Sequence, residues 1–201
     1  AREVHREGND GSEYTGGWLN GKAHGKGKYK WADGTYYDGE WDQGLSHGWG
    51  ELHESSGRVY KGHWYRDKQD GDGEITYSDG TTFKGTFKNG MKHGSGKMKI
   101  SNGDIYVGDF ANDKMHGCGT MVRSSGVKFE GTFEEGYIKE GKVTSFKCIY
   151  EGQFLRKGQQ HGKGKLITLE GVTEYDGYFL MGKTCTKEEF DRYEIEHPLK
   201  I

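Results

Sequence analysis

The chain repeats one phrase at a fixed interval, and this periodicity limits the folds open to it. The phrase is clearest from Tyr14 to Gly27, where it reads Tyr-x-Gly-x-Trp-x-x-Gly-x-x-His-Gly-x-Gly. Successive units begin at an aromatic residue every 23 positions, at Tyr14, Tyr37, Tyr60, Phe83, Tyr106 and Phe129, and the spacing then loosens at Tyr150 and Tyr175. A period of this length is typical of an array of supersecondary units.

Each unit contains two predicted strands. With the opening aromatic residue as position 0, positions 0, 2 and 4 are aromatic, Gly and aromatic, as in Tyr37, Gly39 and Trp41. This period of two predicts a strand with its rings on one face. A second strand follows the His-Gly pair, with Gly at positions 11 and 13. Glycine weakens a strand, so we expect these two glycines to leave room for a ring from the neighbouring strand.

Short turns join these strands. The first connection of the opening unit carries Asn20-Gly21 and the second carries Asp33-Gly34, pairs that accept the positive φ angles of tight hairpins. Parallel crossovers need a dozen or more residues, so such short turns exclude them. The sequence therefore predicts an all-β fold, an elongated and twisted antiparallel meander with one hairpin per unit and a short C-terminal helix.

Three segments follow from this pattern. Residues 1–13 are a tail or the end of an incomplete repeat, because Asp10-Gly11 precedes the first unit as Asp33-Gly34 precedes the second. Residues 14–182 are the array, about seven units and a partial one. Residues 183–201 change character and are predicted to be a capping or docking helix.

The predicted helix has recognisable start and stop signals. Thr186 to Glu189 fits a capping box, Phe190 and Tyr193 share one helical face, and Pro198 ends the pattern. A helix this short needs a surface to pack on. It either covers the exposed last strand or docks on a partner through Phe190 and Tyr193.

Composition fits a thin array rather than a thick globule. The 201 residues include 36 Gly and one Pro, and only 31% are hydrophobic, so aromatic residues and glycines have to supply the packing. The net charge of -2 does not indicate nucleic-acid binding. Three cysteines at irregular spacing favour a reducing compartment, the cytoplasm.

The repeated phrase resembles the MORN (membrane occupation and recognition nexus) repeat over residues 14–182. The sequence departs from the pattern at Asp67 and Asp113 in place of the turn Gly, at Asp70 in place of His, and in the second half of the sixth unit. The resemblance implies a non-enzymatic β module that binds proteins and sometimes membranes. Relatives occur in ciliary radial spokes, cytoskeletal scaffolds and membrane junctions, with unconventional myosins, and joined to lipid kinases or a methyltransferase.

Two patterns that suggest chemistry have structural explanations. Five histidines recur at one repeat position, but strands about 4.8 Å apart keep them too far from one another for one zinc ion, so we expect no metal site and a structural role in the turn; they are His24, His47, His93, His116 and His161. Residues 44–48 match a nucleophile elbow, yet that motif needs a strand-turn-helix context. We therefore expect no catalytic residues and no cofactor.

The aromatic stripe is the predicted binding surface. It packs the ribbon first, but a single curled sheet cannot bury the whole face, which leaves a groove for a helix or an extended peptide. The predicted partner-binding residues are Trp18, Trp41, Trp64, Phe87 and Phe110, with Trp49 and Tyr65 as further exposed anchors. All five tryptophans fall in the first 64 residues, which places the strongest surface there.

The sequence leads to three functional hypotheses. The first is a scaffold or adaptor in the cytoplasm, in a cytoskeletal or ciliary (axonemal) assembly, with a homodimer through the end strands as a possibility. The second is a peripheral membrane module that binds anionic lipid through lysine clusters such as those at 22–30 and 84–99, although acidic residues intervene. The third is an accessory domain of a larger enzyme.

Overall fold

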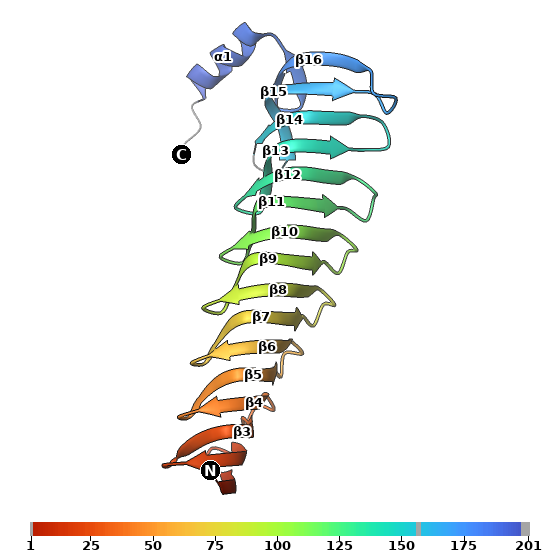
Figure 1. The fold of residues 1–201 in the computed structure, drawn as a ribbon. Coiled ribbons are helices and arrows are strands. Elements are labelled where there is room, and N and C mark those ends of the chain that lie inside the picture. Colours follow the sequence, from red (N-terminus) through yellow and green to blue (C-terminus); the bar gives the residue numbers. More distant parts are fainter. Residues whose placement is uncertain (1, 156–157, 198–201) are drawn as a thin grey trace. The chain divides into compact units, whose positions relative to one another are not determined.

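The computed structural model describes residues 2–155 and 158–197, and these form antiparallel strands followed by one helix (Figure 1). The chain divides into two compact units, residues 1–101 with 111–113, and residues 102–110 with 114–201. Each unit is a succession of hairpins. The described strands are β1 Arg2–Glu7, β2 Glu13–Leu19, β3 Lys22–Lys30, β4 Tyr36–Asp42, β5 Leu45–His53, β6 Val59–Tyr65, β7 Lys68–Thr76, β8 Thr82–Lys88, β9 Met91–Lys99, β10 Ile105–Ala111, β11 Lys114–Val122, β12 Lys128–Glu134, β13 Tyr137–Thr144, β14 Ile149–Leu155, β15 Gln159–Ile167, β16 Thr173–Leu180 and β17 Lys183–Cys185, and the helix is α1 Lys187–Glu196.

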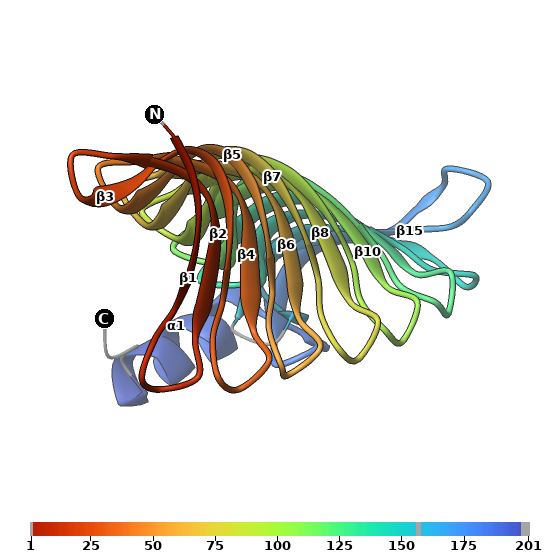
Figure 2. The same cartoon turned by 90° about the horizontal axis from the view of Figure 1, so that it is seen from below.

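The predicted all-β class, the hairpin repeat and the short C-terminal helix are confirmed. Strands pair with their sequence neighbours in antiparallel register, for example Tyr14 opposite Tyr29 and Gly39 opposite Gly50. The strands of the first unit bend in the same direction, so that its sheet is curved (Figure 2). At the N-terminal end, β1 pairs with β2 and takes the place that a second strand of a preceding hairpin would take.

The aromatic residues that open the repeats form the core. Tyr37, Tyr60 and Phe83 are at most 2% exposed. Each tyrosine ring lies over the paired glycines of its own hairpin, and its hydroxyl donates to the backbone oxygen three residues on, as from Tyr37 to Glu40 at 3.0 Å. The ring thus fills the space that the glycines leave, as we predicted for the glycine at position 13 of the repeat.

The glycine at position 11 has a different role from the one predicted. Gly48 has φ = +61°, in the left-handed region, and an added Cβ would meet the Glu40 side chain rather than a core ring. The register shifts beside it, between Gly39 and Glu40, where β4 and β5 form a bulge. A positive φ in this bulge is what favours glycine there. The expectation that both strand glycines receive a ring is therefore wrong for position 11.

The turns agree with the predicted hairpins. Asn20 and Gly21 have φ of 48° and 79°, as a two-residue turn between right-twisted strands requires. In the second connection, the Asp33 carboxylate accepts hydrogen bonds from the Thr35 backbone N–H at 2.8 Å and the Thr35 hydroxyl at 3.0 Å. These bonds hold the pKa of the Asp33 carboxyl below its ordinary value.

Asp67 keeps the turn geometry at a position where other units have glycine. Its φ is 65°, and its Oδ1 accepts hydrogen bonds from the Ser46 backbone N–H at 2.7 Å and the Ser46 hydroxyl at 3.0 Å. Asp113 repeats the arrangement, with φ = 68° and a bond from the Lys92 N–H at 2.9 Å. Each aspartate tolerates the left-handed conformation, and its hydrogen bonds connect the turn to the preceding repeat.

This arrangement predicts a ranking of variants at Asp67. Asp67→Ala should lower the free energy of unfolding by about 2 kcal/mol, because it loses both bonds to Ser46 and keeps the unfavourable φ. Asp67→Gly should cost only about 1 kcal/mol, because glycine accepts that φ. Urea unfolding of the purified chain measures both. Equal stability of Asp67→Gly and the parent would mean that the carboxylate contributes nothing.

Buried tyrosines make the fold sensitive to alkali. Burial of the ring, and then the nearby charge of Asp109, raises the pKa of Tyr106 to about 12. Burial likewise raises the pKa of Tyr150 to about 12, and those of Tyr37 and Tyr60 above their ordinary value. The folded chain therefore keeps phenol protons that the unfolded chain releases near pH 10.0, the ordinary pKa of tyrosine.

The sign of the pH dependence follows from these shifts. The contribution of these tyrosines to stability should be constant below pH 10, where both states keep their phenol protons, and should fall as pH rises towards about 12, the pKa of Tyr106 and Tyr150. Circular dichroism through that range should show cooperative loss of the strand signal. Tyr106→Phe should move the midpoint to higher pH, because Phe83 shows that a ring without hydroxyl fits this position. An unchanged midpoint in that variant would contradict the explanation.

Candidate functional site: an aromatic groove in the first unit

Trp41 and Trp64 each lie between the tyrosine that opens their own repeat and the one that opens the preceding repeat. The centroid of the Trp41 ring lies 5.0 Å from that of Tyr37 in the same repeat and 5.7 Å from that of Tyr14 in the preceding repeat. Both pairs of rings are nearly perpendicular. Trp64 repeats this with Tyr60 at 5.1 Å and Tyr37 at 5.2 Å. Edge-to-face contacts of this kind stabilise aromatic pairs beyond the area they bury.

The indole nitrogens fix the orientation of these rings. Trp41 Nε1 donates to the backbone oxygen of Gly27 at 2.9 Å, and Trp64 Nε1 donates to that of Gly50 at 3.2 Å. A buried N–H needs such an acceptor. The rings therefore form a fixed surface whose polar atoms are already satisfied, and their apolar faces remain to contact a ligand.

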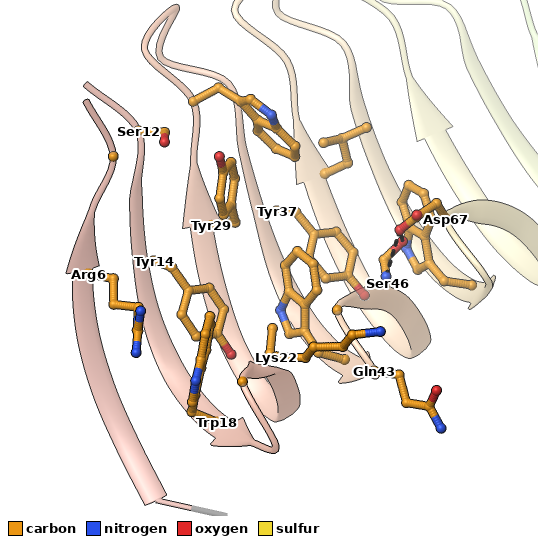
Figure 3. A pocket seen from close by; sticks show the side chains of 18 of the residues that line it. Arg6, Ser12, Tyr14, Trp18, Lys22, Tyr29, Tyr37, Gln43, Ser46 and Asp67 are labelled. Carbon is orange, nitrogen blue, oxygen red and sulfur yellow. Dashed lines mark hydrogen bonds between the residues drawn. The ribbon is translucent and has the colours of Figure 1, made fainter. Parts of the chain in front are cut away.

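A groove of about 990 Å³ lies on this face of the first unit (Figure 3). It runs across β1 to β6 and the turn that follows β6, and its volume is at the upper end of the range for ligand sites in proteins. Aromatic side chains dominate its lining. They are Tyr14, Trp18, Tyr29, Trp31, Tyr37, Trp41 and Trp64, with Arg6, Lys22, Gln43, Leu52 and Asp67 among the others.

The predicted partner-binding residues differ in how much they offer a ligand. Trp18 and Trp41 are half-buried and line the groove, whereas Trp64 lines it at only 8% exposure. Phe87 is 4% exposed, packed on Phe83 and Tyr60. Phe110 lies in the second unit, 3% exposed against Tyr106. The accessible part of the stripe is therefore its tryptophan end.

Trp49 and Tyr65 lie on the opposite face of the sheet. Tyr65 follows Trp64 directly, and Trp49 pairs with His63, which precedes Trp64, so strand alternation turns both away from the groove. They are 46% and 52% exposed. The structure thus separates the predicted aromatic residues into two surfaces.

Sequence reasoning missed several groove residues. Trp31 is 39% exposed and packs on Tyr29 with a centroid distance of 4.7 Å. It follows β3 at the second turn, and the repeat pattern gave no role to that position. Arg6 lines the groove because β1 pairs with β2, which places Arg6 opposite Tyr14. The signal for Arg6 was available in the alternation of Arg2, Val4 and Arg6 on one strand face.

Charges on the opposite face are mixed in sign. Across neighbouring strands, Lys28 pairs with Asp38, Asp38 with Glu51, Glu51 with Lys61, and Lys61 with Glu74. Lys61 Nζ lies 2.9 Å from Glu51 Oε2. Because acidic residues lie among the lysines, these strands present no continuous basic surface, and a continuous basic surface is what attracts a protein to anionic lipid.

The C-terminal helix packs on its own unit. Thr186 and Glu189 form the predicted capping box. Phe190 lies 5.0 Å from the ring of His161 and 5.3 Å from that of Tyr178, and Tyr193 lies 6.1 Å from His161. Glu194 Oε1 is 2.9 Å from His161 Nε2. Both predicted docking residues are thus half-buried against β15 and β16, and Pro198 lies outside the described residues.

Within residues 2–155 and 158–197, no three His, Cys, Asp or Glu side chains gather as a metal site. Ser46, which lies at the start of β5 in the stretch that matches a nucleophile elbow, is 6% exposed, and its hydroxyl donates a hydrogen bond to Asp67. No helix in the described part of the chain is long and apolar enough to cross a bilayer.

Solved structures with similar folds have low sequence identity to this chain. The G-box domain of the microcephaly protein CPAP is 11% identical, with TM-score 0.45, over 86% of this chain and 97% of that one. The TCP domain of SAS-4 (dCPAP) from Drosophila melanogaster, in complex with a proline-rich motif of Ana2, is 13% identical, with TM-score 0.34, over 86% and 87%. The TCP10 domain of Danio rerio CPAP is 16% identical, with TM-score 0.37, over 89% and 100%. The likeness extends to the β fold alone.

The sequence itself identifies the family. No curated protein matches the chain. The family model of the MORN repeat matches residues 14–36, 37–53, 60–82, 83–105, 106–128 and 150–168. The matched segments leave out 129–149, where the sixth unit lacks the His-Gly pair. Since the six segments together cover more than half of its length, this chain belongs to the MORN repeat family.

Proposed function

We propose that the chain is a non-catalytic scaffold that holds a segment of a partner protein in the aromatic groove of its first unit. The observation that supports this most strongly is the tryptophan end of the groove, where Trp18, Trp31 and Trp41 present partly exposed rings on a rigid sheet. Tryptophan and tyrosine are the residues most often found as energetic anchors of protein interfaces. A rigid surface also loses little conformational entropy when it binds.

The first unit suits this role better than the second. All five tryptophans lie within it. The hollow found in the second unit measures about 590 Å³ and is lined by Met121, Phe129, Phe133 and Ile138 among polar residues. It offers smaller rings, and Phe129 and Phe133 are at most 9% exposed. We therefore place the binding surface in the groove of the first unit and not along the whole aromatic stripe.

We place the scaffold in a cytoskeletal or ciliary assembly of the cytoplasm, by analogy with other MORN repeat proteins. Trp49 and Tyr65 form the competing docking surface, on the opposite face. Phe190 and Tyr193 are assigned to packing of α1 on β15 and β16, because both rings are engaged there. The face that a partner uses can be distinguished by substitution, since the two aromatic surfaces share no residue.

Affinity purification with the whole chain tests the proposal. The chain should recover a protein partner from native extract in a defined ratio, and the purified pair should run as one complex on size exclusion. Trp31→Ala should lose the complex and Tyr65→Ala should keep it. A complex that depends on Tyr65 and is indifferent to Trp31 would contradict the groove, and a chain that stays alone would contradict the scaffold.

A further inference from the structure

The groove holds cations that have no acidic partner among the described residues. The Arg6 guanidinium carbon lies over the Trp18 ring, 4.2 Å from the ring centroid, and both side chains are seen at the same end of the groove in Figure 3. Lys22, on β3, lines the groove farther along, where its side chain lies beside Gly44 in the turn between β4 and β5. In the described residues neither side chain takes part in an ion pair, and the same is true of Arg2, which pairs opposite Trp18.

The two carboxylates that line the groove do not face Arg6. Glu7 follows Arg6 directly on β1, so strand alternation turns its side chain to the other face, where its Oε1 lies 3.5 Å from His5 Nε2. Asp67 accepts two hydrogen bonds from Ser46, at the far end of the groove from Arg6. The free hydrogen-bonding capacity near Trp18 is therefore that of donors with positive charge. An arginine presents five N–H donors in a planar fork that fits a carboxylate, and stacking on Trp18 holds this fork in place.

From this charge distribution we propose that the occupant of the groove is an acidic linear peptide segment of the partner protein. A carboxylate of the segment pairs with Arg6 and a second one lies near Lys22. An apolar side chain between them contacts the rings of Trp18 and Trp41. This inference rests on the proposed function and adds the chemistry of the partner to it.

A peptide fits this site better than a membrane surface does. The two cations lie among rings inside a groove, where a side chain can reach both a ring and a charge. The opposite face carries acidic residues among its lysines from Lys28 to Glu74. Lipid attraction needs several basic residues near one surface.

Selection from a displayed library of random linear peptides, with the whole chain as target, tests the inference. Peptides whose binding is lost in Trp31→Ala should be enriched in Asp and Glu around an aromatic or aliphatic residue. For the best of them, Arg6→Gln should weaken binding about tenfold or more, as expected for a charge-assisted hydrogen bond. Arg6→Lys should restore part of the loss, and Glu→Gln in the peptide should reproduce it. Lys26→Gln, also on β3, is the matched control and should leave the affinity unchanged.

The outcomes separate the two proposals. Groove peptides without acidic residues, or peptides indifferent to Arg6→Gln and to salt, would overturn the acidic occupant and leave the protein-binding groove intact. A selection that yields no peptide dependent on Trp31 would overturn both. Vesicles of phosphatidylserine in phosphatidylcholine that bind through Arg6 and Trp31 would replace the peptide with a lipid surface. Circular dichroism and thermal unfolding of each variant should match the parent.

Discussion

Replacing Gly50 by alanine is expected to lower the free energy of unfolding by about 3 kcal/mol or more, because the added methyl has no place to go. A Cβ at Gly50 would lie 2.3 Å from the Tyr37 hydroxyl oxygen and 2.5 Å from the ring carbon that carries it. Tyr37 is 2% exposed and in contact with both Trp41 and Trp64, so it cannot turn aside without moving the groove. Urea unfolding followed by tryptophan fluorescence measures the loss.

Gly21→Ala is the matched comparison, because it separates steric crowding from backbone conformation. Gly21 has φ = +79° with no atom within 4 Å of an added Cβ. Alanine there should cost about 1 kcal/mol, the price of a left-handed residue alone. If Gly50→Ala cost no more than Gly21→Ala, the ring would not be what selects glycine at position 13.

A double-mutant cycle tests the contact directly. Tyr37→Leu removes the phenol ring that a methyl at Gly50 would strike. In that background Gly50→Ala should cost at least about 1 kcal/mol less than in the parent, since contacting residues are not additive. Purely additive effects would place the clash elsewhere, for instance on the backbone of the neighbouring strand.

The repeat made most of the hairpin predictable, because local chemistry alone decides it. Alternating rings set the faces, and Asn20-Gly21 and Asp33-Gly34 set the turns, so strand order and pairing followed without long-range information. The bulge beside Gly48 was not predicted. The only sign of the bulge in the sequence is Gly48, two residues before Gly50. Spacing alone does not distinguish a strand glycine that makes room for a ring from one that adopts a positive φ.

The site was less predictable than the fold, for a physical reason. The stripe of Trp18 to Phe110 was a correct guide to which side chains share a face within each repeat. It did not show which of them stay accessible, because burial depends on how deeply the ring of the preceding repeat covers each one. Trp64 and Phe87 are covered and Trp18 is not, because the unit before Trp18 contributes only the edge strand β1. That same edge places Arg6 on Trp18.

The largest expected effect on function is at Trp31. Trp31→Ala should weaken partner binding by about 2 kcal/mol, or roughly 30-fold in Kd, as for other tryptophan anchors. Stability should change little, because the ring is 39% exposed, contacts Tyr29, and makes no hydrogen bond through its indole nitrogen to any described residue. Trp41→Ala would confuse the two effects, because it also removes contacts to Tyr14 and Tyr37 and the bond to Gly27.

Trp49→Ala is the matched control for Trp31→Ala, since it removes the same side chain at a similar exposure of 46% from the opposite face. Binding by isothermal titration calorimetry to the purified partner should be within about twofold of the parent, the usual effect of substitution outside an interface. If instead Trp49→Ala weakened binding and Trp31→Ala did not, the partner would sit on the face of Trp49 and Tyr65. The groove would then serve packing alone, because its remaining rings are already held by one another and by the backbone oxygens of Gly27 and Gly50.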